Sequence, residues 1–218
     1  MTRLLRVVLA LALAGAGAVG LVSQGGRAAP ADVGMPSAAG AARSPAPAAS
    51  STAAPDVVGT HSAKLGDLAA ATGRLPVALR IPALGIDAPV AGVGVATDGQ
   101  LAVPDDLVRV GWYAAGALPG DAGTALIAAH VDSGHSPGVF FRLDRLVPGA
   151  TVAVVRADHS VATFRVVARR MVAKPRLPVA DLTRTGGPAR LVLVTCGGSY
   201  DRGRRSYRDN VLVYAVPS

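Results

Sequence analysis

The second half of the chain alternates short apolar runs with breaks that contain glycine, proline or charged residues. Valine, leucine and isoleucine dominate the runs, and β-branched residues favour strands. The pattern predicts strands at 77–81, 88–93, 123–129, 151–156, 162–172, 191–195 and 211–216. Many short strands separated by turn signals indicate a sandwich or a closed barrel, so we expect an all-β domain. Apolar residues within 139–147 lie nearer to helical spacing and predict one short helix or 3₁₀ turn.

The first 74 residues differ in character from the rest and predict two non-globular segments. Arg3 and Arg6 precede an apolar run at 7–22, which is typical of an export signal whose charged end stays in the cytoplasm. We expect residues 1–23 to be a retained single-pass anchor, with a cleaved signal peptide as the alternative. Residues 24–74 are rich in Ala, Pro, Ser and Gly and have too few large apolar side chains to fold, so they predict a disordered tether. The folded domain is then expected at 75–218.

Charge and composition argue against nucleic-acid binding and raise the question of what the single cysteine does. The 22 basic and 14 acidic residues give a formal net charge of +8, but the arginines are scattered and aromatic residues make up only 4% of the chain. Nucleic-acid binding, which needs clustered charge and stacking side chains, is therefore not expected. An anionic cell envelope is a better match for the charge. The single cysteine cannot form an intramolecular disulfide, so in an exported protein it is either a small buried apolar residue or a functional thiol.

That cysteine, Cys196, follows the apolar run at 190–195 and precedes two glycines. This pattern predicts a strand end, where scaffolds commonly carry reactive groups, although the segment alone favours neither reading. A thiol is mostly protonated at neutral pH, and catalysis needs a base or an imidazolium beside it. His130 is the best candidate because it also follows an apolar strand. The other histidines are His61 in the tether, His135 in a Gly/Ser/Pro loop and His159 in a predicted hairpin turn.

A charged segment, Ser206-Tyr-Arg-Asp-Asn210, leads into the last predicted strand. An arginine near the thiol would polarise the attacked carbonyl and stabilise an oxyanion, and Arg208 is our candidate. Strand alternation puts Arg208 and Asn210 on the same side, so either is able to face the site. Thr195, Asp132 and Asn210 are candidate substrate contacts. The sequence shows no cluster of metal ligands, and we expect neither a metal nor another cofactor.

Three motifs in this order resemble a sortase, most closely class F: His130-Val-Asp-Ser, Val-Thr-Cys196-Gly-Gly and Tyr207-Arg-Asp-Asn-Val-Leu-Val-Tyr. Leu84-Gly-Ile-Asp and Gly111-Trp-Tyr add to the resemblance, which covers 77–218. It implies a closed eight-stranded β-barrel with one or two short helices. It also implies cysteine transpeptidation at a Leu-Pro-X-Thr-Gly-like sorting signal.

By this resemblance, Cys196 attacks the Thr carbonyl and holds the substrate as a thioester. His130 protonates the departing Gly amine and then helps to deprotonate the acceptor amine, while a backbone N–H and Arg208 hold the oxyanion. The implied partners are exported proteins with a C-terminal sorting signal, an amine of peptidoglycan or its precursor, and the membrane through residues 1–23. We expect a monomer whose catalytic domain lies outside the cytoplasm. The calcium dependence of some sortases is not carried over.

Three alternatives remain at this point. An L,D-transpeptidase would be expected to carry a Ser-x-Gly-Cys-Arg-like stretch, which differs from Val-Thr-Cys196-Gly-Gly. Papain-like cell-wall peptidases usually place the cysteine before the histidine, and here the order is reversed. A tethered β-barrel that binds an envelope polymer without catalysis would leave Cys196 incidental.

Overall fold

The computed structural model describes residues 32–34, 72–97 and 99–218. The predicted anchor, most of the predicted tether and His61 lie outside these residues. Within the part of the chain that is described, no helix is long and apolar enough to cross a membrane.

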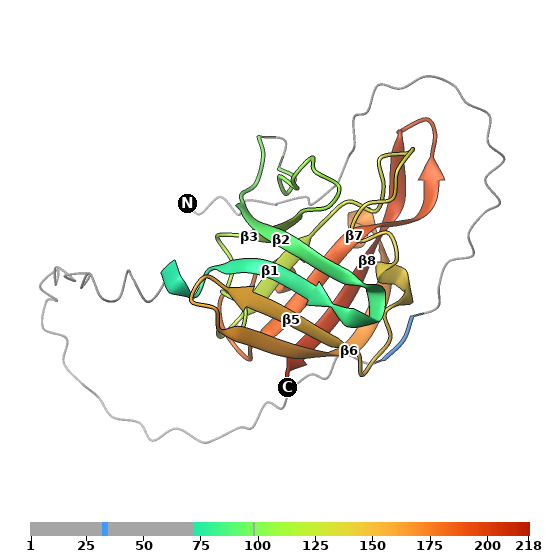
Figure 1. Ribbon diagram of the computed structural model, residues 1–218. Helices are drawn as coiled ribbons and strands as arrows, with labels where there is room; N and C mark the ends of the chain where they lie inside the picture. The colour runs from blue at the N-terminus through green and yellow to red at the C-terminus, as the bar shows by residue number, and fades with distance from the viewer. Residues whose placement is uncertain (1–31, 35–71, 98) are drawn as a thin grey trace, which may run out of the picture.

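Eight strands close into a barrel, which confirms the all-β prediction and selects the barrel over the sandwich (Figure 1). In space the strands follow the order β1-β2-β3-β4-β7-β8-β6-β5. The β2–β3 and β4–β7 pairs are parallel and the other neighbours are antiparallel. The strands are β1 (Pro76–Ile81), β2 (Ile86–Val93), β3 (Val110–Tyr113), β4 (Thr124–Ala128), β5 (Thr151–Arg156), β6 (Val161–Ala173), β7 (Arg190–Asp201) and β8 (Ser206–Pro217).

Short helical segments connect the strands. A 3₁₀ turn, η2 (Leu143–Arg145), confirms the helical spacing predicted for that stretch. Two further 3₁₀ turns are η1 (Pro82–Leu84) and η3 (Lys174–Arg176), and the α-helix α2 (Val179–Leu182) follows η3.

Strand β3 was not predicted. It has only four residues, three of which are buried in succession, and Gly111 lies inside it. A strand this short, without alternation of apolar and polar residues and with a glycine, carries no period-2 signal.

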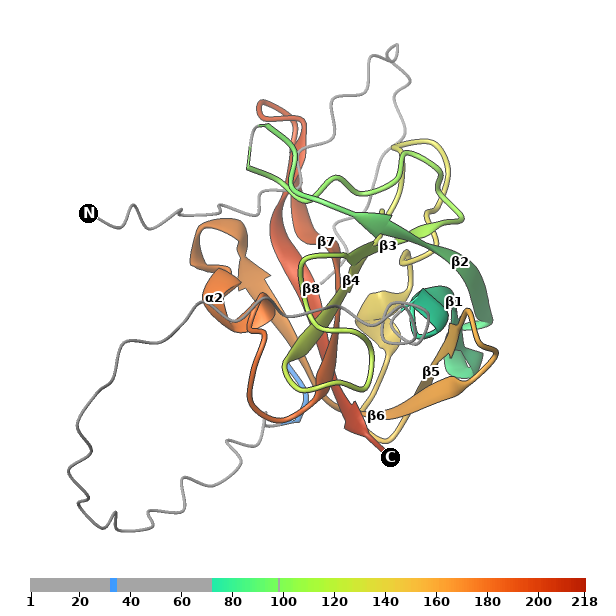
Figure 2. The same cartoon turned by 90° about the vertical axis from the view of Figure 1, so that its left-hand side faces the viewer.

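The barrel supports two apolar layers, one inside it and one on its outer face. Along β7, Leu191 and Leu193 face the inner layer, whereas Val192, Val194 and Cys196 belong to the outer layer. The outer layer also contains residues from α2, which lies outside the barrel (Figure 2) and packs against β4. All five residues of β4 are buried. Strands covered on both faces read as continuous apolar runs, which explains the sequence pattern of β4 and β7.

Strands β7 and β8 continue past the barrel as a two-stranded hairpin, which extends from the same end as the segment between β2 and β3 and the loop after β4 (Figures 1 and 2). The two glycines after Cys196 were expected to end the strand, and this expectation was wrong. They form an irregularity in the β7–β8 pairing, between Gly197 and Tyr200, and β7 continues to Asp201. Gly198 has φ +73°, and a β carbon there would overlap the Asp209 carboxylate, so this bulge requires glycine.

Candidate active site

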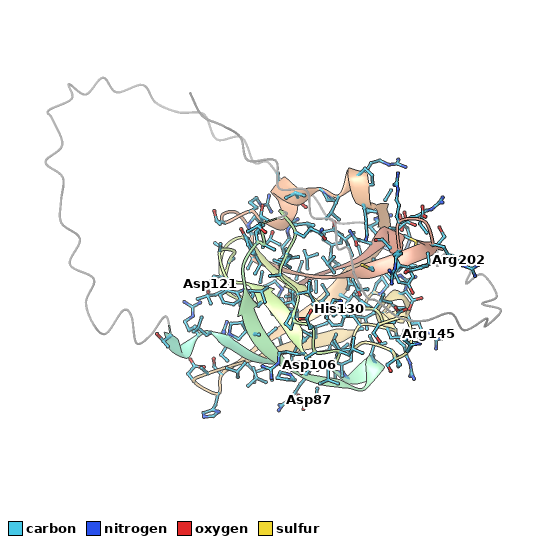
Figure 3. The ribbon with its side chains drawn as sticks, turned by 90° about the horizontal axis from the view of Figure 1, so that it is seen from above. Asp87, Asp106, Asp121, His130, Arg145 and Arg202 are labelled. Carbon is cyan, nitrogen blue, oxygen red and sulfur yellow. The ribbon has the colours of Figure 1, made fainter. Side chains whose placement is uncertain are left out.

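His130 and Cys196 come together because β4 and β7 run parallel. Ala128 pairs with Val194, and continuing this register by two residues sets His130 beside Cys196. The Ala129 amide extends the ladder with a 3.2 Å hydrogen bond to the Val194 carbonyl. Both side chains are buried, with 7% of His130 and 2% of Cys196 exposed. Figure 3 shows His130 near the centre of the molecule, whereas Arg202 lies at its periphery.

The row that starts with these two residues continues across the barrel wall. Cys196 pairs with Asn210 of β8, and Asn210 pairs with Val172 of β6. Paired residues of neighbouring strands point to the same face of the sheet. His130, Cys196, Asn210 and Val172 therefore form one row on the outer face of the barrel.

The Thr195 side chain lies on the inner face of the barrel and links β7 to the residue before His130. It alternates with Cys196 and pairs with Val211, a residue of the inner layer. Its hydroxyl donates a 2.8 Å hydrogen bond to the carbonyl of Ala129, the residue before His130. The structure thus places Thr195 where it fixes the histidine strand relative to the cysteine strand. Its contact with a substrate stays a prediction.

The loop after β4 folds back onto the His130 backbone. The amide of Gly138 donates to the Val131 carbonyl (2.8 Å), and the amide of Phe140 donates to the His130 carbonyl (3.3 Å). A β carbon at position 138 would overlap the His130 carbonyl oxygen. Only glycine permits this close approach, so the loop clamps the backbone that carries the imidazole.

Asp132 joins this loop to the β7–β8 hairpin. Its carboxylate accepts hydrogen bonds from the Tyr207 hydroxyl (2.5 Å) and from the Gly134 amide (3.1 Å). The Tyr207 ring packs edge-on against Tyr200, with 5.2 Å between the ring centroids. Burial, and then the hydrogen bond to Asp132, raise the pKa of Tyr207, so its hydroxyl stays protonated as a donor. The structure therefore brings Asp132 to the edge of the site as a link between loop and hairpin.

Burial shifts the ionisation of the cysteine and histidine in opposite directions. It raises the pKa of Cys196, a shift that Lys174 opposes and Asp132 reinforces. It lowers the pKa of His130, against the opposing effects of Asp105, a backbone hydrogen bond with Pro104, and Asp132. Desolvation disfavours the charged form of each group. A neutral thiol beside a neutral imidazole is therefore the favoured state at neutral pH.

Asn210 is fully buried, and neither its amide nitrogen nor its amide oxygen has a hydrogen-bond partner among the residues that the structure describes. The same holds for Nδ1 of His130. A buried polar group without a partner costs about 1–3 kcal/mol. The two neighbours of Cys196 along the row thus carry buried polar atoms whose hydrogen-bonding capacity is unused among the described residues.

Arg208 is not brought into this group. It precedes Asn210 by two residues on β8, and 65% of its side chain is exposed. Its guanidinium donates a 3.3 Å hydrogen bond to the Asp201 carboxylate in the hairpin. The adjoining arginines Arg202, Arg204 and Arg205 are exposed, as expected of a solvated loop.

Two residues near Cys196 were not among the sequence candidates. Tyr207 lay within a recognised motif, but its link to Asp132 depends on a loop whose path the sequence does not reveal. Lys174 acts on Cys196 through its charge and through a side-chain hydrogen bond. One signal pointed to it: Lys174 is the only lysine within 75–218.

Comparisons with known proteins agree on one family. A family model described as "Sortase domain" matches residues 79–218. Among solved structures, sortase C1 from Streptococcus agalactiae in complex with MTSET is 20% identical, with a TM-score of 0.51, over 65% of this chain and 66% of that chain. A sortase C from Streptococcus pneumoniae is 19% identical (TM-score 0.51, 65% of each chain). Sortase A from Corynebacterium diphtheriae is 18% identical (TM-score 0.50, 66% of this chain and 60% of that chain).

A search of curated protein sequences finds no significant match. At these identities the structural likeness shows the fold alone, so the resemblance to class F stays a prediction.

The raised pKa of Cys196 gives a first testable expectation. Native full-length protein in detergent should be alkylated by iodoacetamide at a rate that rises with pH through a midpoint above that of an ordinary thiol, because only the thiolate reacts. When the same protein is unfolded in urea, the pH midpoint of alkylation should return to about 8.5. The rate is measured by mass spectrometry, and a native midpoint at or below the unfolded one would contradict the desolvation of Cys196.

The clamp on His130 gives a second expectation. Gly138→Ala should lower the free energy of unfolding by about 1–3 kcal/mol, because the added β carbon forces the His130 carbonyl to move. Urea denaturation measures the change. Gly186→Ala is the matched control, since a β carbon there meets open space, and it should stay within about 0.5 kcal/mol of the unsubstituted protein. Equal stability of the two variants would mean that the loop does not hold the histidine backbone.

Proposed function

Because the chain belongs to the sortase family of cysteine transpeptidases, we propose that it cleaves a Leu-Pro-X-Thr-Gly-like sorting signal between Thr and Gly and transfers the acyl group to an amine of the cell wall. The observation that carries this proposal is the row in which His130, just after β4, lies beside Cys196 of the parallel strand β7, with both side chains buried. Membership of this family sets aside the L,D-transpeptidase and papain-like alternatives.

Acylation begins when Sγ of Cys196 gives its proton to His130 and attacks the Thr carbonyl carbon. The C–N bond to Gly then breaks, and the imidazolium delivers the proton to the departing amine. The product is a thioester between Cys196 and the substrate Thr. The buried neutral pair supports this sequence, because a neutral imidazole is the form that accepts the thiol proton.

Transfer repeats these steps in reverse with a different amine. The acceptor amine attacks the thioester carbonyl, and His130 takes the proton that the nitrogen loses. The C–S bond breaks, and the thiolate of Cys196 recovers a proton from the imidazolium. The acceptor that we propose is an amine of peptidoglycan or of its precursor.

Two side chains of β8 are proposed to serve the carbonyl oxygen under attack. Arg208 is the proposed oxyanion stabiliser, together with a backbone N–H, and to act it must exchange Asp201 for the substrate. Asn210 is the proposed substrate contact, supported by its buried and unpartnered amide next to Cys196. Asp132 and Thr195 are the remaining proposed contacts.

The proposed substrates are exported proteins, so the barrel works outside the cytoplasm. We propose that residues 1–23 anchor it as a single pass in the membrane and that the Ala/Pro/Ser-rich tether holds it away from the surface. A monomer suffices for this reaction, because a single chain contributes Cys196 and His130.

The direct test is peptide cleavage and transfer by full-length protein in detergent, given a Leu-Pro-X-Thr-Gly peptide and triglycine as the amine. Mass spectrometry should find the transfer product and a thioester adduct on Cys196. Cys196→Ala should abolish both, and His130→Asn should lower kcat about 10²–10⁴-fold because the proton carrier is lost. His159→Asn, in the exposed β5–β6 turn, is the control and should keep full activity. Equal activity of Cys196→Ala would refute the proposal.

Arg208 is tested separately. Arg208→Ala should lower kcat about 10²–10³-fold, as expected for the loss of one oxyanion donor, with little change in the thermal midpoint because the side chain is exposed. Arg204→Ala removes an exposed charge from the same hairpin and serves as the matched control. If Arg208→Ala retains the kcat of the control, the oxyanion assignment for Arg208 fails.

A further inference from the structure

Lys174 opens η3 directly after β6 ends, on the side of the row opposite His130. It directly follows Ala173, which pairs with Asp209, and it comes two residues after Val172, which pairs with Asn210. Val172 packs against the outer apolar layer that contains Cys196. The 3₁₀ turn η3 begins at Lys174, directly after this pairing, and it contacts β8.

Contacts on both sides hold the ammonium group in place. Nζ donates a 2.7 Å hydrogen bond to Oγ of Ser206, which opens β8. A second hydrogen bond joins the Lys174 side chain to Cys196. Lys174 is half-buried, and Pro175 follows it at the start of η3, which restricts the backbone that presents it. The lysine therefore bridges a β8 hydroxyl and the β7 thiol.

We propose that Lys174 is a further catalytic residue of this chain, whose ammonium group binds Sγ of Cys196 and stabilises the thiolate that attacks and later leaves. This proposal rests on the proposed function for the reaction that the thiolate enters. In this role the thiol proton moves to His130, and the ammonium contributes charge and a hydrogen bond.

The choice of lysine fits this task. Elsewhere within 75–218 the cations are arginines, whose planar guanidinium is suited to carboxylates, as Arg208 is to Asp201. An ammonium is a compact point charge with three donors on one nitrogen, so it can serve a hydroxyl and a sulfur together.

The lysine acts against two opposing influences on the sulfur. Burial and the Asp132 carboxylate both favour the neutral thiol, whereas Lys174 favours the thiolate through its charge and its hydrogen bond. Further ionisable groups near the sulfur include His130, which accepts the proton, and Tyr207, whose hydroxyl stays protonated on Asp132. The Asp209 carboxylate lies against Gly198. Lys174 is thus the cation that offsets the cost of ionising a desolvated thiol. Because the sulfur is neutral in the thiol and in the thioester, the stabilisation is largest in the steps between them.

The pH dependence of Cys196 alkylation tests this role without requiring any peptide to be cleaved. Iodoacetamide rates are measured across pH on full-length protein in detergent, with thermal unfolding as the check on folding. Lys174→Met should raise the thiol midpoint by about one pH unit, which corresponds to about a tenfold loss of thiolate at neutral pH. Lys174→Arg should restore most of the shift because it keeps the positive charge.

Arg176→Met is the matched control, since it removes one positive charge from the same 3₁₀ turn at an exposed position. Its midpoint should equal that of the unsubstituted protein. An unchanged midpoint in a folded Lys174→Met protein would overturn the proposal, as would an equal shift in Arg176→Met, which would reveal a general field effect. If Lys174→Met does not fold, Lys174→Gln replaces it under the same criteria. A midpoint shift in a protein that cleaves no peptide would support Lys174 while refuting the proposed substrate.

Discussion

The parallel ladder between β4 and β7 determines where the histidine and the cysteine lie. Ala128, the last residue of β4, pairs with Val194 of β7, and two residues further along each chain His130 lies beside Cys196. The Thr195 hydroxyl secures this register with its bond to the Ala129 carbonyl, and the loop through Gly138 holds His130 from the other side. The pair is therefore positioned by backbone register, which is more rigid than a placement by loops alone.

The same two strands are covered on both faces, and this burial sets the chemistry of the site. Desolvation leaves the thiol and the imidazole neutral, so the structure must supply the charge that makes the thiol reactive. Asp132 illustrates the balance, because it favours the imidazolium while it opposes the thiolate. A cation close to the sulfur offsets the effect of Asp132 on the thiolate and leaves its effect on the imidazolium in place. Lys174 is in the position to do so.

Short-range patterns in the sequence predicted much of this arrangement. Cys196 and His130 each follow an apolar run, and seven of the strands were recognisable from β-branched residues and turn signals. β3 carries no such pattern. The sequence did not predict that β7 continues through two glycines, because a Gly-Gly pair indicates the end of a strand unless the bulge geometry is known. The position of Lys174 near Cys196 depends on the pairing of β6 with β8. This pairing brings together residues far apart in the chain, and no local pattern encodes it.

Lys174 and Arg208 differ in how firmly they are held, and this difference supports the different tasks that we propose for them. Lys174 is half-buried between Ser206 and the sulfur, so its charge acts on the resting thiol. Arg208 is exposed, and its partner Asp201 also accepts hydrogen bonds from the Gly203 and Arg204 amides, so the carboxylate remains satisfied when the guanidinium leaves. An exposed ion pair contributes little stability, whereas a single oxyanion donor accounts for about 10²–10³ in rate. The proposed exchange of Asp201 for a developing oxyanion therefore costs Arg208 little, whereas the same movement by Lys174 would remove the cation from the thiolate. In the proposed reaction the lysine serves the sulfur and the arginine serves the oxygen.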